Sequence, residues 1–523
     1  MHHDAIDSSL TASASINILD DFSLLHVFYL YRPFLVDECD LEDVKDFMIG
    51  GEGRCVRERW WCKLAHVCQR WRTVILGSTA YLGVSLVCTK GTPVSDVLEH
   101  LPSLPLVIDY SFNMTEDITT EDEERAILAL KQRDRVRCVR LTMAVPSLQK
   151  LIKAMDDEYP ILEYLIVVPL SDTYGTRVIL SEAFQAPHLR HLSLSGFVLP
   201  LECRLLTSAE GLVTLCLGMI IPSTCFHSSS LLKWLSSMPK LEMLIVNFTL
   251  PTINVEGQFK KMPIVTALTL PNLRVFNFRG SSAYLGELLY RITTPRLKNL
   301  QIIFLHMNPF PPFIPRFLQF MNATESLRFE IAKLEFTKFL VNVEFYPRRE
   351  GEIYTFSINA ECWYRKNNNE QPMSRSVAQF FNSSSLMFSA VEHLTLNHKS
   401  HGQSPGWHIE ADRTDWRKLL GTFRNVKTLR IDGALVKELS CCLESDDGEL
   451  PLELLPELHE LTYSGSDDTS DAFTSFIDAR LNAGRPITLV HRNSSTQAQT
   501  QDDLVEARDA EHSSYVYHTF GFM

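Results

Sequence analysis

The stretch Leu189-Arg-His-Leu192-Ser-Leu194 has the form apolar-x-x-apolar-x-apolar, and the same form returns 23 residues later at Leu212. A single match is weak evidence, because any half-buried strand can produce it. Many ordered copies at a near-constant spacing are strong evidence for a repeated structural unit. Ten copies occur, and they begin at Val136, Leu162, Leu189, Leu212, Leu241, Leu273, Leu297, Val391, Val426 and Leu458. The chain from residue 136 onward is therefore predicted to be a repeat array.

The spacing of the copies indicates the kind of repeat. The first seven begin 23 to 32 residues apart, which is the period of leucine-rich repeats stretched by insertions. Each unit of one strand and one helix has an apolar face that it buries only by stacking on its neighbours. We therefore expect an α/β fold, a leucine-rich-repeat solenoid of parallel strands plus helices. Looser copies at Leu327–Phe329 and Ile353–Ile358, and the lack of the usual Asn or Cys after Leu194 and Leu217, predict that the solenoid is irregular.

Segments between the copies predict helices. Leu231–Met238 stops just before Pro239, a residue that cannot continue a helix. Val145–Met155 has Pro146 at an early position, where the missing N–H is tolerated. Farther upstream, the segment Thr120–Glu123 has the capping-box pattern that opens a helix.

Strand residues between the inward leucines point to the opposite, concave face of the predicted sheet. Exposed Tyr, Ile, Met and Val side chains on that face would form a partner-binding patch. Cover by neighbouring loops or by the C-terminal segment is the second interpretation, and the sequence leaves both open. The candidate substrate-binding residues are Tyr164, Ile166, His191, Met243, Ile245, Val275 and Asn277.

Three of the seven tryptophans lie within one N-terminal stretch, Trp60–Ile75. Its larger apolar residues recur at helical spacing, while its Lys and Arg residues lie mostly off that face. This pattern predicts one amphipathic helix with a bulky apolar stripe. The stripe consists of Trp61, Leu64, Cys68, Trp71 and Ile75.

Two short phrases in the N-terminal region resemble the F-box, the helical module of receptors in SCF ubiquitin ligases. LLHVF at residues 24–28 matches the LLxIF part of the family pattern, and VCQRW at residues 67–71 matches its closing phrase at the Val, Cys and Trp. The continuation over residues 72–82 and the segment 91–108 resemble F-box/repeat proteins of mushroom-forming fungi. The resemblance is direct over about residues 16–80 and architectural over most of the rest.

The F-box resemblance implies a small trihelical core and an apolar face that docks a helix of the SCF adaptor. Trp71 is the anchor that we expect, because large aromatic side chains supply much of the binding energy in such interfaces. The alternative is that these helices only cap the N-terminal end of the solenoid. The residues assigned to adaptor binding are Leu19, Leu24, Leu25, Val27, Phe28, Val67, Cys68 and Trp71.

Two features depart from the family pattern. Asp20 replaces the usual Pro of the opening turn, and a loop insertion at about residues 37–58 separates the two halves. Glycines and charges in the insertion indicate a surface loop. Its cost to folding is small, because loop closure costs only about 0.6 kcal/mol more per doubling of loop length. The departures therefore bear on adaptor affinity more than on the fold.

Bulk composition argues against several classes of function. The net charge of −13 disfavours a general nucleic-acid binder. No apolar run is long enough to span a membrane, and the N-terminus lacks the basic and apolar regions of a secretory signal. The twelve cysteines are therefore expected to be reduced thiols. We expect a cytoplasmic or nuclear protein that is not secreted and that does not bind membranes.

No catalytic motif rises above background, since a P-loop, HExxH and GxSxG are all absent. Cys62, His66 and Cys68 do not have a usual zinc spacing. The sequence therefore predicts no catalytic residues, no metal and no cofactor, and the chain is not expected to be an enzyme.

The predicted function is that of the substrate-recognition subunit of an SCF-type E3 ubiquitin ligase. The F-box would dock the adaptor, and through it the cullin, while the solenoid binds a protein substrate for ubiquitination. The alternative, for which Asp20 is the motive, is a non-catalytic leucine-rich-repeat scaffold whose F-box-like helices no longer bind the adaptor.

The same patterns divide the chain into predicted segments. They are a disordered N-terminus (1–15), an F-box-like helical domain (16–80), a linker with the first irregular repeats (81–135), the leucine-rich-repeat-like solenoid (136–490) and a mostly flexible C-terminal tail (491–523).

Overall fold

The protein forms two compact units, residues 1–171 and residues 172–523. The computed structural model describes residues 19–32, 59–101, 103–111, 118–170, 178–200, 202–220, 227–248, 267–304, 313–324, 329–336, 340–347, 355–361, 388, 390–398, 413–443, 454–465 and 471–493. The predicted N-terminal segment 1–15, the predicted insertion 37–58 and the predicted C-terminal tail beyond residue 493 lie outside these residues.

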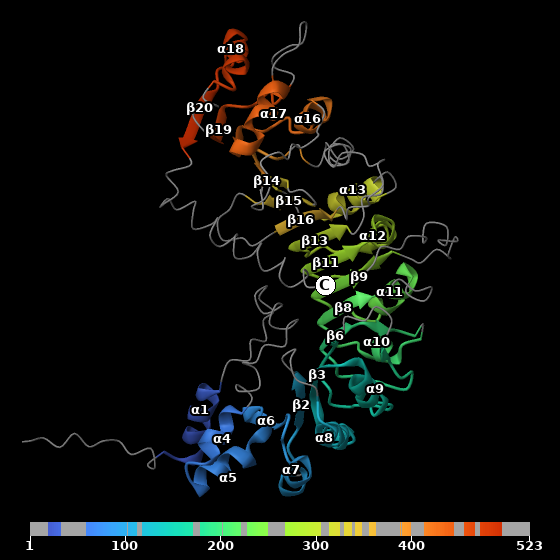
Figure 1. Ribbon diagram of the computed structural model, residues 1–523. Coiled ribbons are helices and arrows are strands. Elements are labelled where there is room, and N and C mark those ends of the chain that lie inside the picture. The colour runs from blue at the N-terminus through green and yellow to red at the C-terminus, as the bar shows by residue number, and fades with distance from the viewer. Residues whose placement is uncertain are drawn as a thin grey trace, which may run out of the picture. The chain divides into compact units, whose positions relative to one another are not determined.

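Unit 1 begins with short helices and continues into a parallel sheet (Figure 1). Its helices are α1 (Asp21–Tyr31), α4 (Trp60–Ala65), α5 (Gln69–Gly77), α6 (Thr79–Leu82), α7 (Val94–His100), α8 (Thr120–Leu130) and α9 (Val145–Lys153), with a 3-10 turn at Arg133–Arg135. Its strands, in sheet order, are β1 (Leu86–Cys88), β2 (Leu106–Ser111), β3 (Val136–Met143) and β4 (Tyr164–Pro169). Neighbouring strands are parallel throughout. The sheet therefore begins within residues 81–135, ahead of the first regular copy.

Unit 2 continues the strand–helix alternation, and helices α10 to α13 follow one side of its strands (Figure 1). Its helices are α10 (Arg204–Ser208), α11 (Ser228–Leu235), α12 (Ser282–Leu289), α13 (Phe313–Ala323), α16 (Arg413–Leu420), α17 (Gly433–Leu443) and α18 (Thr474–Asn482). The main-sheet strands, in spatial order, are β6 (His191–Ser195), β8 (Thr214–Ile220), β9 (Met243–Phe248), β11 (Val275–Gly280), β13 (Asn299–Phe304), β16 (Thr355–Glu361), β15 (Leu340–Tyr346), β14 (Ile331–Phe336), β17 (His393–His398), β18 (Thr428–Ile431), β19 (Glu460–Gly465) and β20 (Thr488–Asn493). Two short parallel pairs accompany them, β5 (Val178–Ile179) with β7 (Phe197–Val198) and β10 (Leu268–Thr269) with β12 (Ile292–Thr293).

The repeat pattern of the sequence is confirmed in the structure. In the copy that begins at Leu189, all three apolar positions are at most 2% exposed, and the other nine copies bury theirs in the same way. The strand register places Leu192 beside Leu215, and Leu215 beside Leu244. Because equivalent residues stack in one layer, each copy covers the apolar face of the next. The predicted irregular leucine-rich-repeat solenoid of parallel strands and helices is present.

The segment β14–β15–β16 departs from the repeat. β16 pairs with β13 in parallel and β14 pairs with β17 in parallel, whereas β15 lies between β14 and β16 and is antiparallel to both. The looser copies near Phe329 and Phe356 are therefore not successive units of a parallel array. Their local spacing resembles a repeat, but the pattern does not fix which strand lies next to which.

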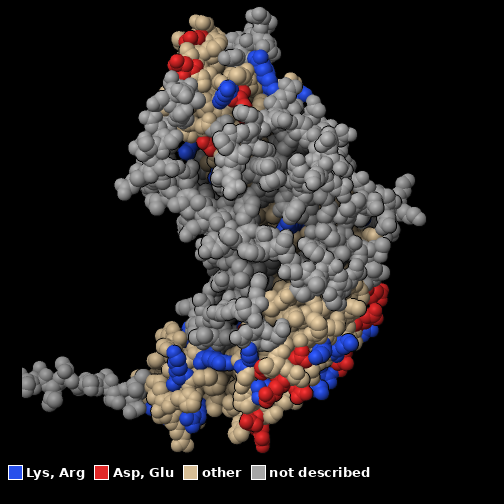
Figure 2. Space-filling view, viewed as in Figure 1, with Lys and Arg blue, Asp and Glu red and all other residues tan. Residues whose placement is uncertain are grey.

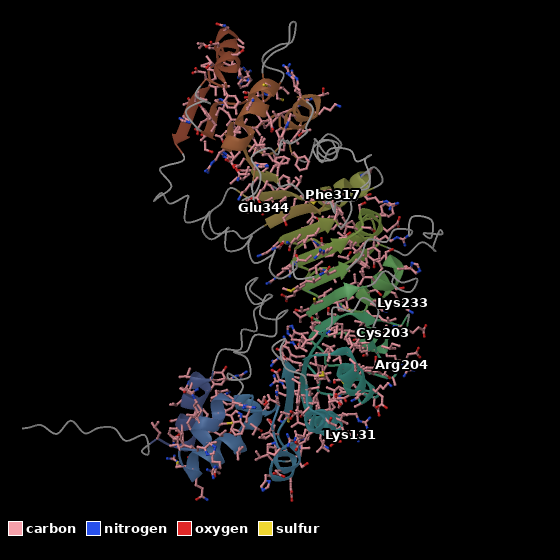
Figure 3. The ribbon with its side chains drawn as sticks, in the orientation of Figure 1. Lys131, Cys203, Arg204, Lys233, Phe317 and Glu344 are labelled. Carbon is pink, nitrogen blue, oxygen red and sulfur yellow. The ribbon has the colours of Figure 1, made fainter. Side chains whose placement is uncertain are left out.

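Phenylalanine side chains fill the core of this irregular segment. The ring of Phe356 lies 5.2 Å from Phe345, 5.7 Å from Phe329 and 5.6 Å from Phe317 of α13, measured between centroids. Phe345 stacks in turn on Phe388 at 5.2 Å. Figure 3 labels Phe317 on the helix that covers these strands. Aromatic packing thus stabilises the antiparallel segment β14–β15–β16. Such ring pairs contribute stabilisation in addition to that from the apolar area that they bury.

The predicted helices are present, with shifted ends. α9 carries Pro146 in its first turn, as expected. α11 begins at Ser228 and ends at Leu235, three residues before the predicted end. The capping interaction of α8 begins one residue earlier than predicted, because Thr119 Oγ1 accepts from the N–H of Asp122 at 3.1 Å and donates to its Oδ2 at 2.9 Å. The pattern located each helix correctly, and the hydrogen bonds at its ends set the boundary.

Candidate docking surface

Helices α1, α4 and α5 form a small bundle at the start of unit 1. Phe28 of α1 meets Trp71 of α5 edge-to-face, with ring centroids 4.9 Å apart. Leu24, Phe28 and Ile75 are at most 1% exposed and form the centre of this core. Trp61 of α4 is also buried and donates from Nε1 to the carbonyl of Ser85 at 3.1 Å, which joins the bundle to the chain that enters β1.

The prediction of one helix over Trp60–Ile75 is wrong. α4 ends at Ala65 and α5 begins at Gln69, and Cys68 between them is extended, with φ −157° and ψ 170°. Arg72 of α5 donates from Nε to the carbonyl of Ala65 at 3.1 Å, so a basic side chain satisfies the end of α4. Apolar spacing does not reveal this break, because two short helices can carry the same stripe.

Asp20, which replaces the usual Pro of the F-box pattern, is the N-cap of α1. Its Oδ1 accepts from the main-chain N–H of Ser23 at 2.7 Å, and this hydrogen bond lowers the pKa of the Asp20 carboxyl. Arg70 of α5 donates to Asp21 Oδ1 at 2.8 Å and to the carbonyl of Leu19 at 2.5 Å. The beginning of α1 is therefore held both by its own cap and by α5.

α1 is apolar on nearly every side, yet its buried residues are Leu24 and Phe28 alone. A helix that is apolar all round normally lies inside a protein, so the remaining sides of α1 lack the cover that their composition calls for. Seven of the twelve large apolar residues exposed in the described part of the chain belong to this bundle and to α6. We call these seven the docking surface: Phe22 (80% exposed), Val27 (41%), Tyr29 (43%), Leu30 (68%), Tyr31 (58%), Val67 (58%) and Tyr81 (49%).

The residues assigned to adaptor binding divide between the core and the surface. Leu24 and Phe28 lie in the core, on the packing side of the division between a trihelical core and a docking face that the resemblance implies. Val27, Val67 and Cys68 are exposed and accessible to a partner. The remaining three are half-buried, namely Leu19, Leu25 and Trp71.

Sequence reasoning missed several members of the docking surface. Phe22, Tyr29, Leu30 and Tyr31 were not candidates, although the last three end the unbroken apolar run of residues 27–31. Such a run exceeds what one buried face of a helix can use. Tyr81 escaped notice because it joins the surface only in three dimensions, through its ring 5.1 Å from Tyr29.

The predicted apolar patch on the concave face is not exposed. Ile166, His191, Met243, Ile245 and Val275 are at most 8% exposed, and only Tyr164 and Asn277 are half-buried. These side chains stack in register with small or apolar neighbours on adjacent strands. His191 faces Thr214, with its Nδ1 3.2 Å from the threonine Oγ1, and Met243 lies between Thr214 and Val275.

A polar row lies on the concave face of unit 2, and of its members only Asn277 was among the candidate substrate-binding residues. Across adjacent strands it consists of Asn277, Gln301, Ser357, Glu344, Lys333, Thr395, Arg430 and Thr462. All except the buried Thr462 are half-buried. Glu344, labelled in Figure 3, accepts from Asn342 Nδ2 and from the hydroxyl of Tyr346, both at 2.6 Å. The row is continuous only because β16, β15 and β14 lie in reversed order, which local patterns do not encode.

Among the described residues, no group of three or more His, Cys, Asp or Glu is placed to hold a metal ion. Burial raises the pKa of the Cys88 and Cys203 thiols to about 11 and that of Cys216 and Cys442 to about 12. These four thiols therefore stay protonated near neutral pH and are poor nucleophiles. No helix within the described ranges has both the length and the apolar character needed to cross a membrane.

Comparisons with known proteins add little. No protein-family model matches the chain, and no curated protein matches it. Among solved structures it is similar to the leucine-rich repeat-containing protein LegL7 from Legionella pneumophila, with 11% identity and a TM-score of 0.23 over 80% of this chain and 93% of that chain. These values are too low to support an inference, so the repeat fold rests on the strand order and register of the chain itself.

Proposed function

We propose that the protein is the substrate-recognition subunit of an SCF-type E3 ubiquitin ligase. In this proposal the docking surface binds the adaptor, which connects the chain to the cullin, and the solenoid holds a protein substrate. The contribution of the chain is binding and positioning, and a separate enzyme transfers the ubiquitin.

One observation carries the proposal: the α1–α4–α5 bundle exposes large apolar residues at the positions that the F-box resemblance assigns to a partner. Val27 and Val67 are 41% and 58% exposed, although both belong to the motifs LLHVF and VCQRW. A bundle that served only to cap the solenoid would turn such residues inward. Clustered aromatic and aliphatic side chains on a surface are characteristic of protein-binding sites.

The polar row of unit 2 supports the second half of the proposal. Its half-buried amides, hydroxyls and charges offer both donors and acceptors to a polypeptide, whereas the buried apolar row offers no accessible contact. A substrate held there would be recognised through hydrogen bonds and ion pairs more than through apolar anchors.

The competing function is a repeat scaffold whose helices have lost the adaptor. Its motive was Asp20, but the geometry gives Asp20 a role as the N-cap of α1. An N-cap of this type stabilises the start of a helix. The change from Pro therefore does not cost α1 its helical start.

The test is co-purification of the full chain with the SCF adaptor. Val67→Asp places a charge on the docking surface, and Leu481→Asp is the matched control, because Leu481 is 57% exposed on α18 of unit 2. We expect the wild type and the control to capture the adaptor and Val67→Asp to lose it, with circular dichroism unchanged in all three. A folded wild type that captures no adaptor would contradict the proposal and favour the scaffold.

A further inference from the structure

The N-terminal helices carry a local excess of positive charge. Residues 19–32 and 59–90 contain six Lys or Arg and two Asp, whereas the whole chain has 50 basic and 63 acidic residues. Figure 2 shows Lys and Arg spread over these helices, while Asp and Glu gather elsewhere in the same view. Within the described residues of this bundle, cations therefore outnumber carboxylates and lie beside the exposed apolar side chains, while the segment 33–58 between the two ranges holds eight Asp or Glu and three Lys or Arg.

The two acidic residues of the bundle are already engaged. Asp20 caps α1, and Asp21 pairs with Arg70. Two other cations of the bundle donate to neutral groups: Arg59 donates to Thr89 Oγ1 at 2.8 Å, and Arg72 donates to the carbonyl of Ala65. Four cations of the bundle have no carboxylate of a described residue at ion-pair distance, namely Arg32, Arg59, Lys63 and Arg72.

These cations are interleaved with the docking surface. Lys63 lies in α4, four residues before Val67 of the α4–α5 junction. Arg32 follows Tyr31 directly, and Arg59 precedes Trp60, whose ring lies 6.3 Å from that of Tyr31. Apolar anchors with a cationic rim are complementary to an apolar groove or helix with a carboxylate rim.

We infer that the docking surface is built for an acidic partner, one whose apolar centre is flanked by Asp and Glu. This inference rests on the proposed function only in taking the adaptor to be that partner. The rim cations steer the encounter, and their long-range attraction raises the association rate by about tenfold or more at low salt. The apolar residues then supply the contact area.

A direct test uses two designed amphipathic helical peptides as probes, one with Leu and Glu and one with Leu and Lys at the same positions. Binding of each labelled peptide to the full chain is followed by fluorescence anisotropy at low and at physiological salt. We expect the Glu peptide to bind at least about tenfold more tightly at low salt and to lose most of that advantage as salt rises. Equal binding, or tighter binding of the Lys peptide as the overall charge of −13 favours, would overturn the inference.

Charge-reversal variants locate the effect. Arg59→Glu/Lys63→Glu should remove the preference for the Glu peptide, while Lys131→Glu, at the exposed end of α8 and labelled in Figure 3, should retain it. Equal losses in both variants would mean that only net charge matters, which contradicts a built rim. Residues 37–52 contain seven Asp or Glu and one Lys. If neither peptide binds until that segment is replaced by Gly and Ser, the segment is the occupant and the inference falls.

The adaptor separates the failure of this inference from that of the proposed function. If the adaptor binds but its association rate is insensitive to salt and to Arg59→Glu/Lys63→Glu, the proposed function stands and the acidic-partner inference falls. If the Glu peptide is preferred but the adaptor does not bind, the inference stands, and the ubiquitin-ligase assignment falls in favour of another acidic protein.

Discussion

The N-terminal bundle and the repeat strands use similar apolar residues in opposite ways. In the repeats, the three inward positions of each copy are buried by the neighbouring copy, down to 0% exposed for Leu215 and Leu244. In the bundle, α1 buries only Leu24 and Phe28 and leaves Phe22, Val27, Tyr29, Leu30 and Tyr31 exposed. A repeat supplies its own partner surface in the next unit, whereas no described element covers these five side chains of α1 in the same way.

This difference separates residues that hold the fold from residues that remain available to a partner. Truncating a repeat leucine or core phenylalanine should cost folding free energy, because its contacts are internal. Truncating a residue of the docking surface should cost little stability and much affinity. A docking-surface variant that lowers the free energy of unfolding as much as a core variant does would contradict this distinction.

The largest effect is expected at the centre of the irregular segment. Phe356→Ala should lower the free energy of unfolding by about 4 kcal/mol, because the ring contacts Phe317, Phe329 and Phe345. Chemical denaturation measures the change. Tyr290→Ala, at a residue 57% exposed beside α12, should cost less than about 0.5 kcal/mol. A Phe356→Ala cost no larger than that of the control would refute the aromatic core.

A smaller effect is expected within α1 itself. Leu24→Ala should cost about 3 kcal/mol, because Leu24 is 0% exposed, while Leu30→Ala, at 68% exposed, should cost less than about 0.5 kcal/mol. Urea denaturation followed by tryptophan fluorescence is suitable, since Trp60, Trp61 and Trp71 report on this bundle. Similar costs at the two leucines would mean that α1 has no distinct buried face.

The reactivity of native cysteines should show the same difference between the exposed bundle surface and the buried repeat strands, without any substitution. Cys68 is exposed at the α4–α5 junction, whereas Cys216 is buried on β8 and burial raises its pKa to about 12. At pH 8 the alkylation of Cys216 by iodoacetamide should be at least about a hundredfold slower, since only the thiolate reacts. Peptide mass spectrometry measures both rates in one sample. Comparable rates would show that the repeat strands open as readily as the bundle surface.

The smallest expected effect is a pH dependence of α1. The hydrogen bond from Ser23 lowers the pKa of Asp20 in the folded state. The charged cap therefore stabilises α1 above the unfolded-state pKa of Asp, and this contribution is lost as pH falls below about 4. Amide exchange of α1 should accelerate over that interval in the wild type. In Asp20→Asn, which keeps an accepting oxygen but does not titrate, the acceleration should be smaller. An identical pH profile of amide exchange in both proteins would contradict the claim that the charged Asp20 side chain stabilises α1.

The repeats were predictable because each copy has the same spacing of apolar residues within one short segment. Leu189, Leu192 and Leu194 already show which side of the strand is buried, and nine further copies confirm the period. The order β13–β16–β15–β14–β17 was not predictable, because spacing within a strand does not specify its neighbour or its direction. The polar row through Glu344 and Lys333 depends on that order and was missed with it.

The candidate site was predictable only in part. The motif residues Val27 and Val67 were recognised and are exposed, but Leu24 and Phe28 belong to the same motif and lie in the core. A sequence motif shows which residues occur together, but it does not show which of them are buried in the core and which are exposed to a partner. The break at Cys68 was hidden for a related reason, because Arg72 supplies from three-dimensional proximity the hydrogen bond that ends α4.

The most direct measurement of the central claim is hydrogen–deuterium exchange of the full chain with and without saturating SCF adaptor. We predict slowed exchange over α1, from Asp21 to Tyr31, and over the α4–α5 junction at residues 66–68, with exchange in the strands of both units unchanged. The result would contradict this claim if protection from exchange were confined to the concave face. No protection anywhere, at adaptor concentrations that saturate a control receptor, would also contradict it, because the docking surface would then not bind the adaptor.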